Sequence, residues 1–378
     1  MKKMHYEELV DVIWGATLMG GGGGGSIQNG LQLLDTYRKA HGEPELNLLS
    51  YQERDEKSEA AVTAGMGSPA AIEGHDFTPY AVNAFALLQD MAKRMGKELS
   101  CCIPVELGGF NTFVPMLISL LNGSPFVDAD GAGRAVPALD TLLLHVNGCA
   151  TSPLAMSNAN NDKVTIELTD AHDAKLAEKL GRDVCIEFGM KAGLSGWMVT
   201  REDIEKRIVD GSITLVQKIG AICRKHLNDP EHIFAAIAAE NIVPVKQVAV
   251  GKVTKVESKT SGGFDYGLVT IEGDTGTYRI DFQNENLLLS KRNGDAFVPI
   301  MTVPDITCMY CIKAMEGSPA QPGMPLSNAD VKEGMEVGLG VIKVNKKWFV
   351  TDGTWWNVWK DYLDIVHYAG PNIPFEKV

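Results

Sequence analysis

Apolar residues at helical spacing and short apolar runs take turns along the first half of the chain, and these two patterns predict helices and strands in alternation. The predicted helices cover residues 6–19, 26–40, 79–96, 112–121, a segment after 168 through 180, and 200–226 as long helices. The predicted strands cover residues 46–50, 60–65, 99–105, 163–168 and 184–188, with a further strand near 126. Such alternation is typical of an α/β layer, in which the loops at strand ends carry the chemistry.

The pattern changes near residue 241. Residues 242–344 are rich in Val, Ile, Thr and Gly and alternate with period two, as over 247–256, which predicts a β-rich subdomain, a barrel or a sandwich. Trp355, Trp356 and Trp359 are expected to dock the tail onto the rest of the chain, or otherwise to form an exposed partner patch. We therefore expect an N-terminal α/β domain over 1–168 with a Gly-rich loop and acidic loops, and a C-terminal half over 169–378 that is helical at 169–240, β-rich at 241–345 and ends in a docking tail at 346–378.

Composition and charge narrow the classes of protein. The chain has 378 residues, 35 basic and 48 acidic side chains and a formal charge of −13, without the clustered basic residues that a nucleic-acid partner requires. Its apolar runs are shorter than the ~20 residues of a membrane span, and no signal-peptide pattern opens it. Seven cysteines, an odd number, fit free thiols in a reducing compartment. We expect a cytoplasmic protein with neither a nucleic-acid nor a membrane partner.

The feature that stands out is a run of six glycines, Gly20–Gly25, between two predicted helices. Backbone N–H groups in such a run can form a nest for an anion or a carbonyl oxygen. A dinucleotide-binding fingerprint would follow a strand, and a P-loop would continue with Lys and Ser or Thr, so the sequence fits neither motif. A flexible linker is the alternative. We expect Gly22, Gly23, Gly24 and Gly25 to line a ligand site.

Acidic side chains follow two of the predicted strands. Glu106 ends one of them, and Asp128 and Asp130 end another, with Asn111 and Arg134 nearby. Carboxylates gathered at one sheet edge can bind a divalent metal or act as acid and base. In the alternative interpretation, Asp130 caps a turn and Arg134 neutralises Asp128.

A metal at this edge could gain a histidine ligand. We consider Glu106, Asp128, Asp130 and His75 as its ligands, and an imidazole would favour zinc or manganese over magnesium. A lone histidine is more often a surface residue. In the β-rich part, Asn284 and Glu285 lie in a polar cluster that could reach the same cleft, although turn chemistry also explains it.

Several short motifs in order resemble the S-methyl thiohydantoin desulfurase family. The two most specific are Glu106-Leu-Gly-Gly-Phe-Asn111 and Asp128-Ala-Asp-Gly-Ala-Gly-Arg134. They are accompanied by Gly67-Ser68-Pro69, Asn284-Glu285-Asn286 and Val303-Pro304-Asp305. The resemblance covers nearly the whole chain and implies an α/β half and a β-containing half that act on a thiohydantoin or hydantoin-like ring. It also implies substrate contacts from Ser68, Asn284 and Glu285.

The chemistry that this resemblance implies is hydrolysis. Water adds to a thioamide-like carbon and sulfide or a thiol leaves, with a bound metal activating the water. Glu106 or Asp128 would accept the proton, Arg134 or the glycine N–H groups would hold the ring oxygen, and Asn111 would orient the ring amide. The alternatives are a ring-opening cyclic amide hydrolase and a non-catalytic accessory subunit of a hydantoinase-type system. We expect the protein to act as a homo-oligomer on a small cyclic amide or thioamide.

Overall fold

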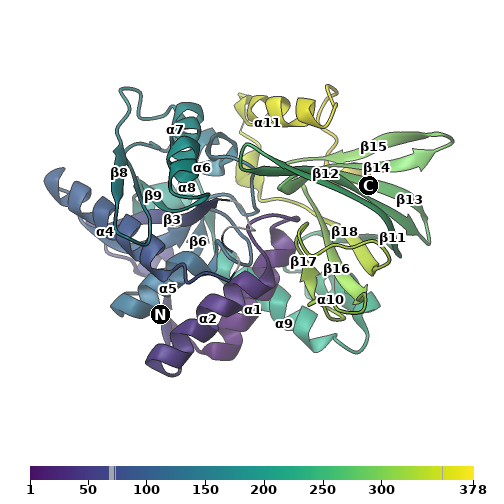
Figure 1. The fold of residues 1–378 in the computed structure, drawn as a ribbon, viewed down its shortest axis with the longest axis horizontal. Coiled ribbons are helices and arrows are strands. Elements are labelled where there is room, and N and C mark those ends of the chain that lie inside the picture. The colour runs from purple at the N-terminus through teal and green to yellow at the C-terminus, as the bar shows by residue number, and fades with distance from the viewer. Residues whose placement is uncertain (68–71, 73, 351) are drawn as a thin grey trace.

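The computed structural model describes residues 1–67, 72, 74–350 and 352–378, so Ser68 lies outside the described residues. Two parts lie side by side, an α/β part built mainly from the first half of the chain and a β-rich part built mainly from the second (Figure 1). The expected combination of an α/β domain with a β-rich subdomain is confirmed. No helix within the described residues is long and apolar enough to cross a membrane.

A mixed five-stranded sheet forms the centre of the α/β part. Its strand order is β4-β3-β9-β7-β8, in which β3 and β4 are parallel and the other pairs are antiparallel. The strands are β3 (Glu59–Gly67), β4 (Leu99–Pro104), β7 (Leu154–Ser157), β8 (Lys163–Ile166) and β9 (Lys191–Val199). β9 comes from beyond residue 168 and pairs with both β3 and β7, so the later half of the chain contributes a strand to this sheet.

Helices and two small sheets complete the α/β part. The helices are α1 (Tyr6–Met19), α2 (Ile27–His41), α4 (Thr78–Arg94), α5 (Phe113–Asn122), α6 (Leu143–Val146), α7 (Ala174–Glu187), α8 (Arg201–Lys206) and α9 (Ser212–Lys225). β1 (Lys2–Met4), β2 (Leu46–Leu49) and β5 (Phe126–Val127) form one small sheet, and β6 (Ala129–Asp130) pairs with β10 (Val209–Asp210). The helices predicted on either side of the glycine run are thus present as α1 and α2, and the Ser26 hydroxyl caps α2 by accepting the Asn29 N–H.

The strand predicted at 184–188 is wrong, because these residues end helix α7 or follow it directly. The apolar run Val184-Cys185-Ile186 looks strand-like when it is taken alone. In the helix, however, Ala174, Ala177, Gly181 and Cys185 form one buried face at helical spacing. The pattern missed two strands of this sheet, the short β7 and also β9, where glycines and Trp197 interrupt the period.

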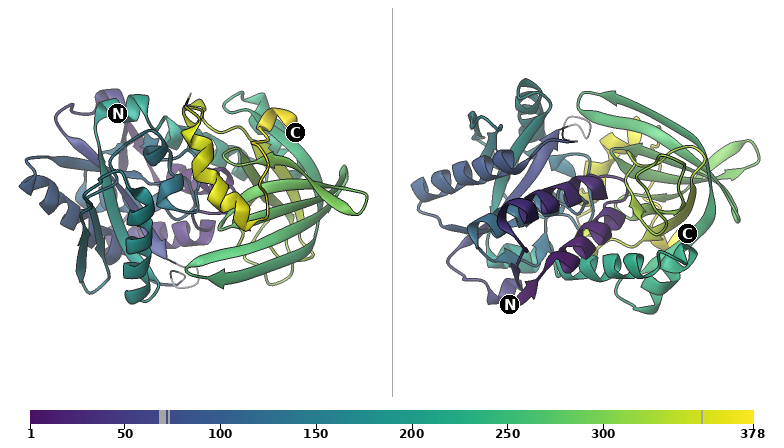
Figure 2. Two further views of the ribbon diagram at one scale, coloured as in Figure 1. Left: turned by 90° about the horizontal axis from the view of Figure 1, so that it is seen from above. Right: turned by 60° about the horizontal axis from the view of Figure 1, so that its bottom comes forward.

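The β-rich part is one antiparallel sheet in the order β15-β14-β13-β12-β11-β18-β16-β17. Its strands are β11 (Val245–Ser261), β12 (Phe264–Gly273), β13 (Gly276–Gln283), β14 (Glu285–Asn293), β15 (Ala296–Thr302), β16 (Ile306–Lys313), β17 (Pro325–Leu326) and β18 (Glu336–Ile342). Helix α10 (Ile233–Ala239) precedes this sheet. The long β11–β12 hairpin extends toward the α/β part (Figure 2), where the Phe264 ring lies 4.4 Å from the Arg182 guanidinium of α7.

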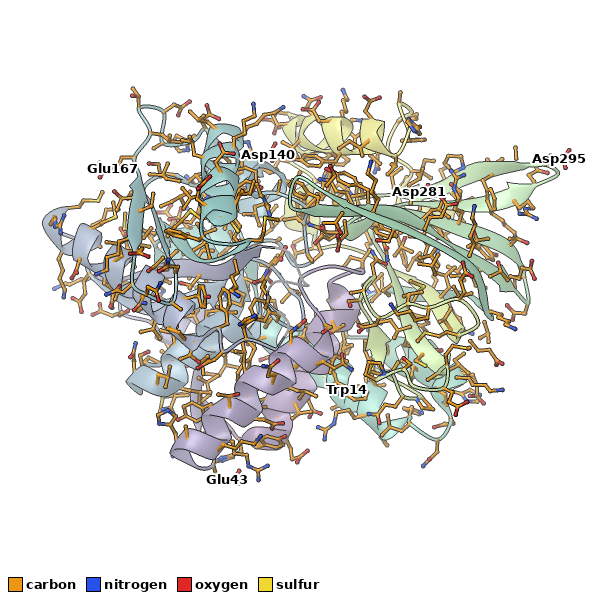
Figure 3. All side chains as sticks on the ribbon, in the orientation of Figure 1. Trp14, Glu43, Asp140, Glu167, Asp281 and Asp295 are labelled. Atoms are coloured by element: carbon orange, nitrogen blue, oxygen red, sulfur yellow. The ribbon has the colours of Figure 1, made fainter. Side chains whose placement is uncertain are left out.

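The C-terminal tail lies against both parts. Trp348 and Trp359 are completely buried, and the Trp348 indole donates a 2.8 Å hydrogen bond to the Ala132 carbonyl. Helix α11 (Thr354–Ile365) also carries Tyr362, whose hydroxyl donates a 2.6 Å hydrogen bond to Asp140. Asp140 lies beside this helix (Figure 3). The tail thereby helps to fix the two parts relative to each other.

Candidate active site

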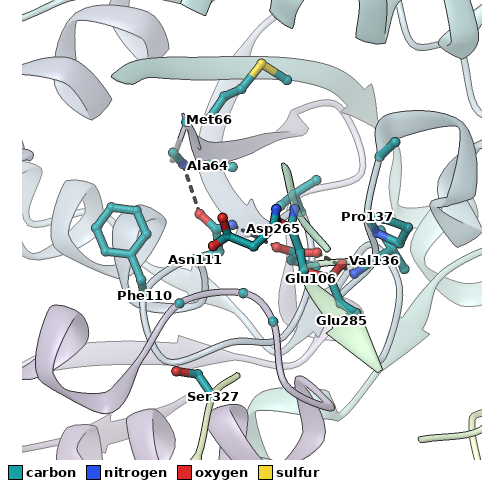
Figure 4. A pocket seen from close by; sticks show the side chains of 18 of the residues that line it. Ala64, Met66, Glu106, Phe110, Asn111, Val136, Pro137, Asp265, Glu285 and Ser327 are labelled. Carbon is teal, nitrogen blue, oxygen red and sulfur yellow. Dashed lines mark hydrogen bonds between the residues drawn. The ribbon is translucent and has the colours of Figure 1, made fainter. Parts of the chain in front are cut away.

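A cavity of about 170 Å³ lies between the two parts (Figure 4). The α/β part contributes the glycine run, the end of β3 and the loops after β4 and β6, and the β-rich part contributes β13, β14 and the segment after β17. Its lining includes polar side chains from both parts: Ser26, Asn29, Glu106, Asn111, Glu178, Arg182, Ser258, Asp265, Asn284, Glu285, Ser327 and Asn328. Phe110, Val136, Leu194 and Phe282 are among its apolar walls.

Glu106 reaches this cavity from the loop that follows β4. Its Oε1 accepts a 2.8 Å hydrogen bond from Asn111 Nδ2, and its Oε2 accepts a 2.7 Å hydrogen bond from the Val136 N–H. Burial raises the pKa of Glu106 to about 7, although both hydrogen bonds favour its charged form. This carboxyl can therefore gain or lose a proton near neutral pH.

Glu285 lies next to Glu106 in the cavity wall (Figure 4) and comes from the first residue of β14. It is 2 % exposed, and its Oε2 has no hydrogen-bond partner among the described residues. Burial holds the pKa of Glu285 well above its ordinary value, and the neighbouring Glu106 carboxyl raises it further. The positive charge of Arg134 partly opposes this rise in the pKa of Glu285.

The Asn111 side chain is held in one orientation. Its Oδ1 accepts a 3.0 Å hydrogen bond from the Gly65 N–H at the end of β3, so its Nδ2 must be the atom that donates to Glu106. The last residue of the motif Glu106-Leu-Gly-Gly-Phe-Asn111 thus donates a hydrogen bond to the side chain of its first residue. The contact orients the Glu106 carboxyl toward the cavity.

The glycine run is a folded loop that joins the two parts. The Gly21 and Gly22 carbonyls accept hydrogen bonds from the Asn286 and Asn328 N–H groups of the β-rich part, each at 2.8 Å. On the other side, the Gly24 carbonyl accepts the N–H groups of Phe110 and Asn111 at 3.1 Å. Gly22 to Gly25 all line the cavity, so the structure brings the expected glycines together with Glu106 and Glu285.

Gly23 leaves no room for a side chain, because an added Cβ would lie 1.9 Å from Glu285 Oε1. We expect Gly23→Ala to displace Glu285 and to lower kcat/KM by about 10²-fold or more, the size of a lost acid–base group. The test is kcat/KM of the purified variant on an S-methyl thiohydantoin, compared with the wild type. Gly294→Ala in the β14–β15 hairpin is the control, since that glycine has positive φ but no atom within 4 Å, and it should retain activity. Full activity of Gly23→Ala would contradict the assigned position of Glu285.

Arg134 and Asp130 lie behind the cavity wall. The completely buried Arg134 guanidinium donates to the Pro304, Asp305 and Asn286 carbonyls of the β-rich part and to the Ala135 carbonyl. Asp130 accepts the N–H groups of Ala132 and Gly133, which folds the turn that leads to Arg134. Neither side chain lines the cavity, so their expected contact with substrate is not seen, and the turn-capping interpretation of Asp130 fits the geometry.

Asp128 does not line the cavity either, because its carboxylate caps the N-terminus of helix α9. Its Oδ1 accepts the N–H groups of Ile213 and Thr214 at 2.8 and 3.0 Å, and its Oδ2 accepts the Thr214 hydroxyl. These N–H groups belong to the first turn of α9, which has no partner for them within the helix. The expected catalytic role of Asp128 is therefore replaced by that of a helix cap.

Asp128→Ala is expected to lower the free energy of unfolding by about 1–2 kcal/mol, the usual cost of a lost cap. The activity of the folded fraction should stay near that of the wild type. Urea unfolding together with an activity assay tests both expectations. A large fall in kcat with unchanged stability would return Asp128 to the catalytic site.

The expected metal ligands do not converge. Glu106 faces the cavity, Asp128 caps α9, Asp130 folds a turn, and His75 lies exposed before α4. Within the described residues no three His, Cys, Asp or Glu side chains are grouped as a metal would require. This donor set does not fit zinc or manganese, and we derive no step through a metal.

Asn284 and Glu285 both line the cavity, as the sequence led us to expect. Asn284 forms the turn between β13 and β14 with a φ of 55°, and its Oδ1 accepts the N–H of Asp265 on β12 at 2.8 Å. That turn directs Glu285 inward. The sequence did not indicate Asn328, Glu178 or Arg182, because none of them stands in a motif.

Two family models match the chain. The N-terminal domain described as S-Me-THD-like matches residues 7–168, and the C-terminal domain of the same description matches residues 171–355. The chain belongs to the S-methyl thiohydantoin desulfurase family. The resemblance first seen in the motifs around Glu106 and Asp128 is thereby confirmed.

A solved structure shares the fold. The crystal structure of a protein from Chromobacterium violaceum superposes with a TM-score of 0.83 at 22 % sequence identity, and the match covers 99 % of this chain and 100 % of the other. At this identity the likeness concerns the fold alone. A search of curated proteins found no match.

Proposed function

We propose that the chain is a hydrolase that replaces the exocyclic sulfur of a thiohydantoin with oxygen from water. Water adds to the ring carbon that carries sulfur, the carbon–sulfur bond breaks, and a carbonyl forms at that carbon. From an S-methylated ring the sulfur leaves as a thiol with one proton of the water, and the other proton stays on the adjacent ring nitrogen. From a free thiohydantoin the sulfur leaves as hydrogen sulfide with both protons of the water. Membership of the family supports a thiohydantoin-related function.

The observation that carries this proposal is the pair Glu106 and Glu285 at one wall of the cavity. Environments that push two neighbouring carboxyl pKa values apart assign one carboxyl as the base and the other as the acid. Glu106, which accepts two hydrogen bonds in its charged form, is the base that takes a proton from the attacking water. Glu285, whose pKa burial raises, is the acid that donates a proton to the departing sulfur.

The other cavity groups hold the ring. Asn111 fixes the Glu106 carboxyl, and the glycine run lets a flat ring approach the backbone where any side chain would intrude. The catalytic residues of the proposal are thus Glu106 and Glu285, with Asn111 and the glycine run positioning the base and the ring.

We expect kcat/KM to have a bell-shaped dependence on pH. A base must be ionised, so kcat/KM should rise with pH through about 7 as Glu106 loses its proton. An acid must be protonated, so kcat/KM should fall at higher pH as Glu285, whose pKa is raised, loses its own. Initial rates measured across the pH range test this. Glu285→Gln should remove the alkaline limb, and an alkaline limb of wild-type shape in that variant would contradict the assignment.

Product analysis tests the reaction itself. Purified protein is incubated with an S-methyl thiohydantoin and with the corresponding hydantoin, and the products are separated by liquid chromatography and mass spectrometry. The proposal predicts hydantoin and methanethiol from the first compound, with the ring intact. An opened ring would show a cyclic amide hydrolase, and no product from either compound would favour a non-catalytic accessory role.

A further inference from the structure

Two buried polar atoms of the cavity-lining residues lack a hydrogen-bond partner among the described residues. They are Glu285 Oε2 and Asn328 Oδ1. Both residues lie against consecutive glycines of the loop, because an added Cβ would lie 2.5 Å from Asn328 Nδ2 at Gly22 and 1.9 Å from Glu285 Oε1 at Gly23. Glu285 already has a role in the proposed reaction, whereas Asn328 has none.

The orientation of the Asn328 amide is determined by its neighbours. Its Nδ2 donates to the Asn284 carbonyl at 2.8 Å and to Asn286 Oδ1 at 2.9 Å. Asn286 Oδ1 must accept, because Asn286 Nδ2 donates to the Thr307 carbonyl. The atom of Asn328 that is left over is therefore its carbonyl oxygen, which can only accept a hydrogen bond.

The backbone of Asn328 is held as firmly as its side chain. Its N–H donates a 2.8 Å hydrogen bond to the Gly22 carbonyl, so the residue cannot turn away from the glycine loop without breaking contacts. A buried carbonyl oxygen without a donor is costly and calls for a partner that the protein alone does not supply. The residue is thus prepared for a donor that arrives with a ligand.

We propose that Asn328 is a substrate-positioning residue whose side-chain carbonyl accepts a hydrogen bond from an N–H group of the bound ring. This inference rests on the proposed function and deepens it, since it makes the site selective for rings that keep a particular nitrogen unsubstituted. A site built to hydrogen-bond an N–H discriminates strongly against an analogue that lacks it. A methyl group on that nitrogen removes the donor and places carbon against the oxygen.

Binding of the intact ring tests this without any turnover. Isothermal titration calorimetry compares hydantoin with its 1-methyl and 3-methyl derivatives on the wild type, on Asn328→Ala and on Ser327→Ala. Ser327 is the matched control, because it lines the same cavity but its hydroxyl already donates to Asp330. Thermal unfolding of each variant checks that it is folded, and Asn328→Ser replaces Asn328→Ala if the latter does not fold.

We expect one methylated ring to bind the wild type at least about tenfold more weakly than hydantoin, the size of one lost buried hydrogen bond. In Asn328→Ala the ratio of the two dissociation constants, methylated ring over hydantoin, should fall close to one, whereas in Ser327→Ala it should stay as in the wild type. Equal binding of all three rings to the wild type would overturn the proposal, and so would an undiminished ratio in Asn328→Ala. Absence of turnover with this binding pattern intact would instead count against the proposed reaction.

Discussion

Glu106→Gln is expected to lower kcat/KM by about 10²–10⁴-fold, the range in which a general base contributes. Glutamine keeps the size of the side chain and an oxygen that can accept the Asn111 or Val136 hydrogen bond, but it cannot take a proton from water. Methanethiol release from an S-methyl thiohydantoin, followed with a thiol reagent, gives the rate. Asp281→Asn is the matched control, since Asp281 is also a buried carboxyl of raised pKa but does not line the cavity.

The stability of the Glu106→Gln variant shows whether its loss of activity comes from the missing base or from misfolding. The native state holds a proton on Glu106 up to about pH 7, whereas an unfolded glutamate loses it near its ordinary pKa of 4.5. Between these values the native state binds more protons, so the contribution of Glu106 to stability falls as pH rises. Glu106→Gln lacks this loss and should unfold at pH 8 no more easily than the wild type. Substantial residual turnover in a stable Glu106→Gln protein would show that another group is the base.

Arg134→Met is expected to lower the free energy of unfolding by about 3–5 kcal/mol, the cost of breaking a buried charged network. The guanidinium joins the turn after β6 to three carbonyls of the β-rich part, and methionine leaves all of them without a donor. Its positive charge also lies near the Glu285, Asp305 and Glu106 carboxyls. Urea unfolding measures the loss.

Arg292→Met provides the comparison, because Arg292 is an exposed residue of β14, and surface substitutions usually change stability by less than about 0.5 kcal/mol. If Arg134→Met and Arg292→Met unfolded at the same urea concentration, the assigned role of Arg134 in joining the two parts would be wrong.

The sequence predicted the elements whose patterns are local. Helix α2 is amphipathic and capped by Ser26, and α1 ends at the glycines that the pattern pointed to, although its residues from Leu9 to Met19 are buried on all sides. The alternating residues 247–256 lie in β11. Glu106 and Asn111 could also be predicted as site residues from the sequence. They are only five residues apart, and the glycine pair between them lets the chain turn so that their side chains meet. Family motifs added Glu285, which local reasoning placed only in a polar cluster.

The features that the sequence did not predict depend on contacts between residues far apart in the chain. Asp128 and Asp130 stand two residues apart, as two ligands on one face of a strand would, yet Asp128 serves the N-terminus of α9 more than eighty residues later. The β-strand propensity of 184–188 yields to packing of the α7 face against the sheet. Asn328 carries no motif, and only its approach to the glycine loop, some three hundred residues earlier, gives it significance.

The central claim is that, above the Glu106 pKa of about 7, Glu106 and Glu285 together hold one proton, with Glu285 as the protonated partner. Infrared spectroscopy measures this directly, because a protonated carboxyl has a C=O stretch distinct from the bands of a carboxylate. The difference spectrum between the wild type and Glu285→Gln at pH 8 should show a protonated carboxyl that only the wild type has. A difference spectrum with carboxylate bands alone would mean that Glu285 is ionised and would contradict the account.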